Sequence, residues 1–136
     1  MNVEDVLSWI KTLSTKPDHY YAGTLNDKKD KSFGVYQLKE SRAREMAVGG
    51  FQTTKTVSKG ISILVHWNAS TRETEAAAAD LYNDLQTATG VTIGGHSVFY
   101  INLLHNEPVD VGTDANGVCE RVIEFIIYYE RSNETT

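Results

Sequence analysis

The clearest pattern in the chain is a two-residue alternation in the segment ISILVHWNA, residues 61–69. Its apolar side chains fall on one side of an extended chain, as in a strand with one buried face; they are Ile61, Ile63, Val65 and Trp67. Shorter apolar runs predict strands at about residues 20–25 and 33–38, and the polar segment NDKKDKS between them is typical of a hairpin loop. A further strand, SVFYINLLH, precedes the loop NEPVDVGTDANG.

Spacings of three and four residues predict two helices. The first covers about residues 3–13, with Asn2 as its N-cap and Pro17 limiting its extent. The second begins after Ser70, because Ser70 and Glu73 have the spacing of a capping box, and Gly90 suits its left-handed end. The order helix, strands, helix, strands predicts an α+β domain. We expect a mostly antiparallel β-sheet with two main helices packed on one face.

The last apolar segment, from Val118 to about residue 130, predicts a strand too long for the helix to cover. About 13 extended residues span roughly 43 Å, whereas a helix of about 18 residues spans roughly 27 Å. Apolar side chains occupy both faces of this strand. The second face also carries Glu120, Glu124 and Tyr128, a mixture typical of a surface that is partly wet and partly covered. The hypothesis is that another copy of the protein covers it.

Composition favours one soluble domain over residues 1–136. A chain of 136 residues is too short for two comfortable cores, and it has 40% hydrophobic and 23% charged residues. No apolar run approaches the roughly 20 residues that span a bilayer, so no membrane partner is expected. A net charge of -5 argues against a protein built to bind nucleic-acid phosphates. One cysteine fits a reducing cytoplasm.

The acidic loop before the last strand does not have the spacing of a calcium site. If Gly117 is the invariant glycine of an EF-hand loop, the first and twelfth positions are Gly112 and Ile123, which supply no carboxylate. The segment DANG is therefore interpreted as a turn. We predict no metal and no cofactor.

Nothing in the spacing of the nucleophilic and basic side chains indicates catalysis. Cys119 has no obvious histidine partner and is expected in the core, where free cysteines are often buried. The four histidines lack metal-site spacings; they are His19, His66, His96 and His105. Core positions are also expected for the aromatic residues Trp9, Trp67, Tyr100 and Phe125. No catalytic residue is predicted, so we expect that the protein is not an enzyme.

Several structural patterns occur together in one order. They are the segment YYAGTLNDKKDKSFGVYQLK, then AVGGFQTTKTVSKG leading into ISILVHWN, the helix ETEAAAADLYNDL, and the closing GTDANGVCERVIEFIIYYE. In these patterns, over roughly residues 19–131, the chain resembles the minor capsid and tail terminator proteins of long-tailed bacteriophages. The resemblance implies a homo-hexameric ring at the head-proximal end of the tail tube. Such a ring ends tube growth and offers a surface to the head.

The resemblance also implies partners and a location. The partners are copies of the chain itself, the tail-tube protein and a head completion or connector protein, with DNA passing through the lumen without specific binding. The location is the virion, after assembly in the host cytoplasm. A ring needs two complementary patches per subunit. One expected patch is the second face of the last strand; the other comprises Arg42, Arg44, Met46, Val48 and Phe51.

The second patch lies in a segment without a convincing period, residues 40–60, which is predicted to leave the sheet and to become ordered on assembly. Other functions stay open at this point. The chain could be a head completion or neck protein, or a small ligand-binding regulatory domain with an apolar pocket. An enzyme ranks last.

Overall fold

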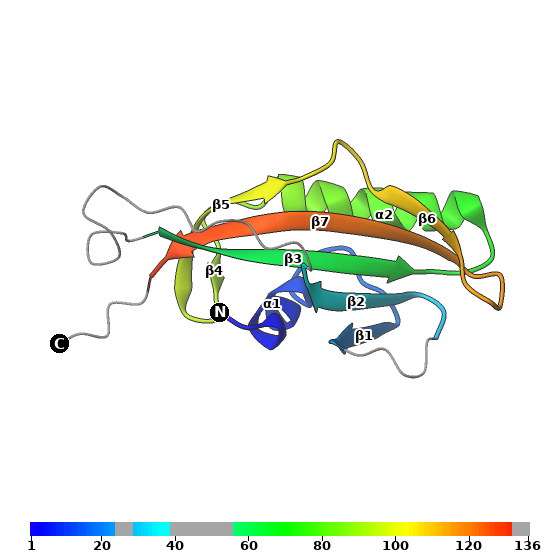
Figure 1. The fold of residues 1–136 in the computed structure, drawn as a ribbon, viewed down its shortest axis with the longest axis horizontal. Coiled ribbons are helices and arrows are strands. Elements are labelled where there is room, and N and C mark those ends of the chain that lie inside the picture. Colours follow the sequence, from blue (N-terminus) through cyan, green and yellow to red (C-terminus); the bar gives the residue numbers. More distant parts are fainter. Residues whose placement is uncertain (24–28, 39–55, 132–136) are drawn as a thin grey trace.

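A computed structural model of the chain describes residues 1–23, 29–38 and 56–131. Its centre is a seven-stranded sheet in the order β1-β2-β3-β7-β5-β4, with β6 also paired to β7 (Figure 1). The strands are β1 (His19–Ala22), β2 (Ser32–Gln37), β3 (Thr56–His66), β4 (Thr92–Ile93), β5 (His96–Leu103), β6 (Val109–Thr113) and β7 (Cys119–Glu130). The helices are α1 (Val3–Ile10) and α2 (Thr71–Gln86). The predicted α+β class with a mostly antiparallel sheet is confirmed.

The hairpin predicted from the first two strands is wrong. β1 and β2 pair in parallel, with His19 opposite Ser32. The chain therefore returns to the starting end of β1 before β2 begins. Lys31 fixes that return: its φ is 56°, its N–H donates to the Trp67 carbonyl at 2.7 Å, and its carbonyl accepts from the N–H of Asp18 at 2.8 Å. The polar segment between the strands is long enough to retrace a four-residue strand of about 13 Å.

β3 and β7 form the longest pair, in continuous register from Thr56 opposite Glu130 to His66 opposite Glu120. The start of β3 is a correction, because residues 56–60 were expected to lie outside the sheet. Alternate residues on one side of the two strands are fully or almost fully buried; they are Ile61, Ile63, Val65, Ile123, Phe125 and Ile127. The two-residue period thus located the core face of both strands.

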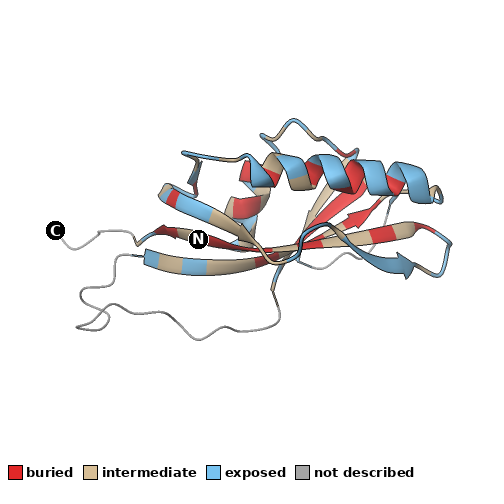
Figure 2. Cartoon of the chain, turned by 90° about the horizontal axis from the view of Figure 1, so that it is seen from above, coloured by how far each residue is buried: buried red, intermediate tan, exposed pale blue. Residues whose placement is uncertain are grey.

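Buried residues from both helices join the same core cluster as these strand residues. α1 contributes Val6, Trp9 and Ile10, and α2 contributes Ala78, Leu81 and Leu85. Figure 2 shows α2 lying along the sheet with its buried residues turned toward the strands. A single shared cluster is in keeping with both helices packing on one face, which stays a prediction.

The helix starts follow local capping, with one difference from expectation. Asn2 and Asp5 form a reciprocal capping box, in which each side chain accepts from the backbone N–H of the other. At α2, the Ser70 hydroxyl accepts from the Glu73 N–H at 3.2 Å. The Ser70 N–H, however, donates to the Asn68 side chain at 2.9 Å. Asn68 therefore takes the place that the capping box assigns to Glu73.

The expected loop before β7 contains an additional strand. β6 pairs with β7 through Val109 opposite Val122 and Thr113 opposite Cys119. β5 pairs with the same edge of β7 further along, from Val98 opposite Tyr129 to Leu103 opposite Phe125. β5 pairs only with the later residues of β7, from Phe125 to Tyr129. It therefore leaves the same edge of β7 unpaired at the residues before them. β6 occupies that edge despite its Gly and Asp content.

Candidate assembly surface

β5 and β6 form an open edge of the sheet. β4 pairs with β5 only at His96 and Ser97, and within residues 1–23, 29–38 and 56–131 no strand pairs with the outer edge of β6. All five residues of β6 are exposed. An uncovered edge presents backbone N–H and C=O groups that another chain can pair with.

The large apolar side chains that remain exposed gather on these two strands. Phe99 is 54% exposed, Tyr100 56%, Val109 37% and Val111 50%. Isolated exposed apolar residues are ordinary on protein surfaces, but a group of them beside an open strand edge is typical of an interaction site. The sequence reasoning did not identify this edge.

Tyr100 corrects one core expectation. It is exposed, and its ring stacks on Tyr128 at a centroid distance of 4.7 Å and an angle of 16°. A β-bulge between Val98 and Tyr100 shifts the register of β5 there, and the successive residues Phe99 and Tyr100 are both exposed. Trp9 and Phe125 are in the core as expected. Trp67 is partly buried and packs against that core.

Glu120, Glu124 and Tyr128, predicted on the second face of β7, follow one another at intervals of four residues. Each interval spans about 13 Å along a strand, so the three side chains form a line rather than a cluster. Glu120 is 9% exposed, and Glu124 is half-buried with its carboxylate 3.1 Å from Nε2 of His105. Burial, and then the charge of Glu120, raise the pKa of the Tyr36 hydroxyl. Tyr128 stacks with the exposed Tyr100, so it links this face to the open edge. The predicted patch of Arg42, Arg44, Met46, Val48 and Phe51 lies outside the described residues.

The acidic loop that opens β7 is held by Asp114. One carboxylate oxygen of Asp114 accepts from the N–H groups of Asn116 at 2.8 Å and Val118 at 3.0 Å. The other lies 2.8 Å from Nε2 of His66, which is 1% exposed and whose Nδ1 donates to the Lys29 carbonyl at 2.9 Å. This side chain therefore ties the β6–β7 turn to β3 and to the residues before β2. The hydrogen bonds of Asp114 therefore stabilise the turn that the sequence predicted at DANG.

Asp114 should make stability depend on pH. The hydrogen bond to His66, followed by the bond from the Val118 N–H, lowers the pKa of Asp114 from 3.8 to about 2. A depressed folded-state pKa gives a stabilising contribution that is complete above the unfolded-state pKa and is lost as pH falls from about 4 to about 2. The variant Asp114→Asn is expected to be less stable than the native chain at pH 6, with the difference shrinking toward pH 2. Urea unfolding at pH 6, 4 and 2 measures this.

The control for removing a carboxylate is Asp80→Asn, on the exposed side of α2. A difference between Asp114→Asn and the native chain that is the same at pH 6 and pH 2 would contradict the role assigned to the His66–Asp114 contact.

The side chains considered for catalysis are engaged in local contacts. Cys119 is not in the core as expected; it is half-buried, and its sulfur lies 3.6 Å from the Thr71 hydroxyl at the start of α2. Cys119 is the first residue of β7 and lies between the buried Val118 and Glu120. His96 contacts the Glu130 carbonyl at 3.2 Å. In the part of the chain that the structure describes, no group of three His, Cys, Asp or Glu residues is placed to hold a metal ion.

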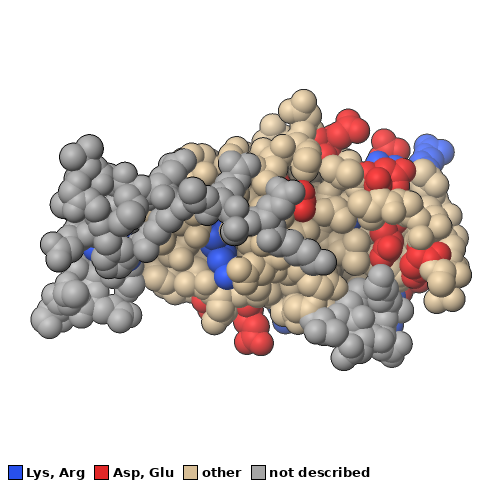
Figure 3. Space-filling view, in the orientation of Figure 1, with Lys and Arg blue, Asp and Glu red and all other residues tan. Residues whose placement is uncertain are grey.

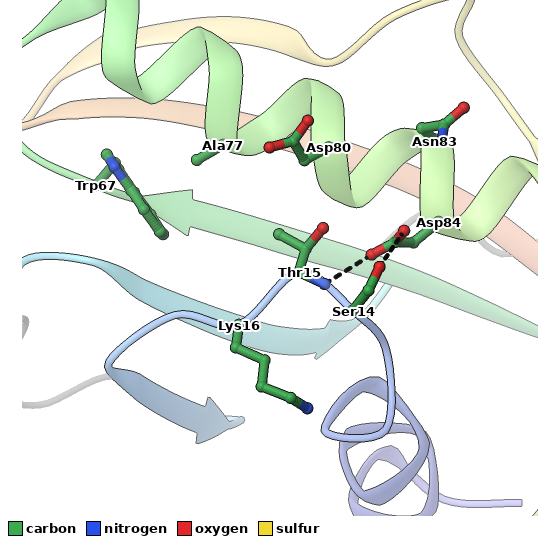
Figure 4. A pocket seen from close by; sticks show the side chains of 8 residues that line it. All are labelled: Ser14, Thr15, Lys16, Trp67, Ala77, Asp80, Asn83 and Asp84. Carbon is green, nitrogen blue, oxygen red and sulfur yellow. Dashed lines mark hydrogen bonds between the residues drawn. The ribbon is translucent and has the colours of Figure 1, made fainter.

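A polar hollow of about 500 Å³ lies between α2 and the segment after α1 (Figure 4). Asp84 holds its wall together: its two carboxylate oxygens accept from the Ser14 hydroxyl and the Thr15 N–H, each at 2.9 Å. Burial opposes ionisation of Asp84, but the hydrogen bonds from Thr15 and Ser14 outweigh it and lower the pKa. A small-ligand domain would instead need an apolar pocket with convergent free polar groups.

The described residues thus define an α+β domain whose sheet has an unfinished, partly apolar edge. Such a surface is typical of subunits that assemble with other chains. The sequence pattern of the family described as bacteriophage tail terminator protein matches residues 3–131. The chain belongs to this family, which confirms the family resemblance predicted from the sequence. It is therefore a phage structural protein.

Comparison of folds gives a second finding. A chain from the virion of a native gene transfer agent particle is similar in fold, with a TM-score of 0.53 and 16% sequence identity. The match covers 93% of this chain and 85% of that chain. No curated protein sequence matches. Among the described residues, no helix has the length and apolar character needed to cross a membrane.

Proposed function

We propose that this chain is a tail terminator that assembles as a closed ring of six copies on the head-proximal end of the phage tail tube. The ring ends polymerisation of the tube and offers a surface for head attachment. Each copy acts as a single domain over residues 1–136 and has a structural rather than a catalytic role. The observation that carries the proposal is the family match across almost the whole chain.

The exposed edge supports the self-assembly that this function requires. A ring forms when one surface of each copy binds a different surface of the next and the rotation closes. The apolar side chains on β5 and β6 provide one such surface. The line of Glu120, Glu124 and Tyr128 and the patch of Arg42, Arg44, Met46, Val48 and Phe51 remain proposed contacts with other copies or with the tail and head.

The charge of the chain supports a passive passage for DNA. A net charge of -5 suits a ring whose lumen repels phosphates, because basic walls would retain the genome. The partners in this proposal are the tail-tube protein on one side and a head completion or connector protein on the other. Assembly takes place in the host cytoplasm and the product stays in the virion.

Tube growth in the presence of the chain tests this function. Purified tail-tube protein from the same phage is polymerised alone, with the chain, and with an unrelated protein of similar size and charge. Electron microscopy is expected to show shorter tubes with a ring at one end only when the chain is present. Unchanged tube lengths and bare tube ends would contradict the proposal. Binding to isolated heads instead of tubes would support the alternative of a head completion protein.

A further inference from the structure

We infer that copies of the chain join edge to edge, with β6 of one copy pairing against β1 of the next. This inference rests on the self-assembly in the proposed function and names the surfaces that carry it. The two strands lie at opposite sides of the sheet, with β2, β3 and β7 between them. Four steps of about 4.8 Å place the two edges roughly 19 Å apart. The surfaces are therefore distinct, as a ring requires.

The two edges match in length and in availability. β6 has five residues and β1 has four. In the described part of the chain, β2 is the strand that pairs with β1, which leaves the far edge of β1 without a strand partner. Pairing of two such edges satisfies backbone groups on both strands and covers the exposed Val109 and Val111. On the β1 side of the contact, Tyr20 packs against the core and stays only half-buried, so part of its ring adds apolar surface.

The charges beside the two edges are opposite. Two exposed acids mark this edge: Glu107 just before β6 and Asp110 within it, with a guanidinium nitrogen of Arg121 3.7 Å from the Asp110 carboxylate. Acidic side chains gather over the end of the molecule where β6 lies (Figure 3). Half-buried Glu124 follows on β7.

Beside β1 the balance is positive. The ammonium group of Lys11 lies 5.6 Å from the centre of the Tyr20 ring, and that of Lys16 donates to the Lys11 carbonyl at 2.7 Å. Exposed Lys29 and half-buried Lys31 precede β2. Among the described residues that flank β1 and β2 here, the acids Asp18 and Asp30 offset these four lysines only in part.

Opposite charge selects the head-to-tail arrangement over a two-fold one. Two β6 edges facing each other would bring Glu107 and Asp110 against the same acids, and two β1 edges would bring lysines together. Like charges across an interface disfavour the wrong pairing, whereas opposite charges favour encounter and fix register. The β6-to-β1 contact avoids facing like charges and brings opposite charges together. The same contact can repeat from copy to copy around a ring.

Disulfide trapping tests the contact. The native cysteine is first removed by Cys119→Ser. Val111→Cys on β6 and Ala22→Cys on β1 are then introduced together, and each is also made alone. Native mass spectrometry of the unmodified chain is run in parallel. Under mild oxidation the double variant is expected to give a ladder of covalent multimers that reducing agent collapses, and a mixture of the two single variants to give dimers only.

Each other outcome has a definite meaning. Covalent dimers from Val111→Cys alone would replace the proposed contact with a two-fold one. Native multimers without any covalent ladder would overturn the edge contact and leave self-assembly standing. A monomer at every concentration by native mass spectrometry would overturn both the edge contact and the ring.

Charge reversal provides an independent measurement. Glu107→Lys is expected to weaken self-association about tenfold at low salt, and adding Lys29→Glu is expected to restore part of it. The matched control is Glu75→Lys, which makes the same change of net charge on the exposed side of α2. If Glu107→Lys and Glu75→Lys weaken self-association equally, the change in net charge alone explains the weakening. That result would overturn the assigned pairing.

Discussion

Replacing Phe125 by alanine is expected to lower the free energy of unfolding by about 3–5 kcal/mol, the range for removing a buried aromatic ring. Phe125 has no exposed surface and lies in the middle of β7, opposite Ile61 of β3 and Leu103 of β5. Its ring belongs to the cluster that joins the sheet to both helices. The cavity left by alanine would lie where those layers meet, so neighbouring side chains can fill little of it. Urea unfolding followed by circular dichroism measures the change.

Tyr128→Ala is the matched control on the other face of the same strand. Tyr128 lies three residues further along β7, is half-buried, and stacks its ring on exposed Tyr100. Such a pair contributes about 0.5–1.5 kcal/mol, so the loss should be well below that for Phe125→Ala. Unfolding is measured at a protein concentration that keeps the chain monomeric. Equal losses for the two variants would show that Tyr128 is packed as tightly within one subunit as Phe125, against the assembly interpretation for this part of β7.

The sequence located the parts of the fold where local pattern and tertiary burial agree. The alternation of Ile61, Ile63 and Val65 marks the buried side of β3, because a period of two can place side chains on one face only. Helix α1 follows Asn2 for an equally local reason, the capping box with Asp5. The β7 boundaries also follow from its apolar residues.

Which strands pair was harder to predict from the sequence, because pairing depends on where the chain goes after each strand. The polar segment between β1 and β2 fits a tight hairpin as well as a longer return, and the contacts of Lys31 with Trp67 and Asp18 decide for the return. β6 was missed for a related reason. Its sequence, VDVGT, resembles a loop, and it becomes a strand because β7 has an edge left free.

The open edge was missed because exposure is a property of the assembled sheet. The run from Val98 to Ile101 is apolar at successive positions, which fits a strand with two covered faces. Apolar side chains on both faces of β7 led to the hypothesis that another copy covers that strand. The same argument applies to β5 from its sequence. The register shift between Val98 and Tyr100 that exposes Tyr100 has no signal in the sequence. The predicted residues on β7 and the exposed residues on β5 nevertheless meet, at Tyr128 and Tyr100.

Val111→Asp is expected to weaken self-association by roughly 30-fold or more while changing the free energy of unfolding little. Val111 is half exposed in the single chain, so the substitution disturbs no core. In the β6-to-β1 contact its side chain would be covered, and a carboxylate there would lose water without gaining a close partner. Truncating a central interface residue often changes binding by about 2 kcal/mol, which corresponds to that factor. Sedimentation equilibrium over a range of concentrations measures the association, and urea unfolding measures the fold.

The control for this variant is Ser97→Asp, which adds the same charge to an exposed residue of β5 at the point where β4 already occupies the edge. If the open edge is the contact, Ser97→Asp leaves association close to that of the native chain, because no neighbouring copy can pair there. If both variants weaken association equally, added charge rather than position is responsible, and the edge of β6 is not the joining surface. If neither does, copies meet through another face. The line of Glu120, Glu124 and Tyr128 on β7 would then be the first surface to test, because it borders the same apolar group through Tyr100.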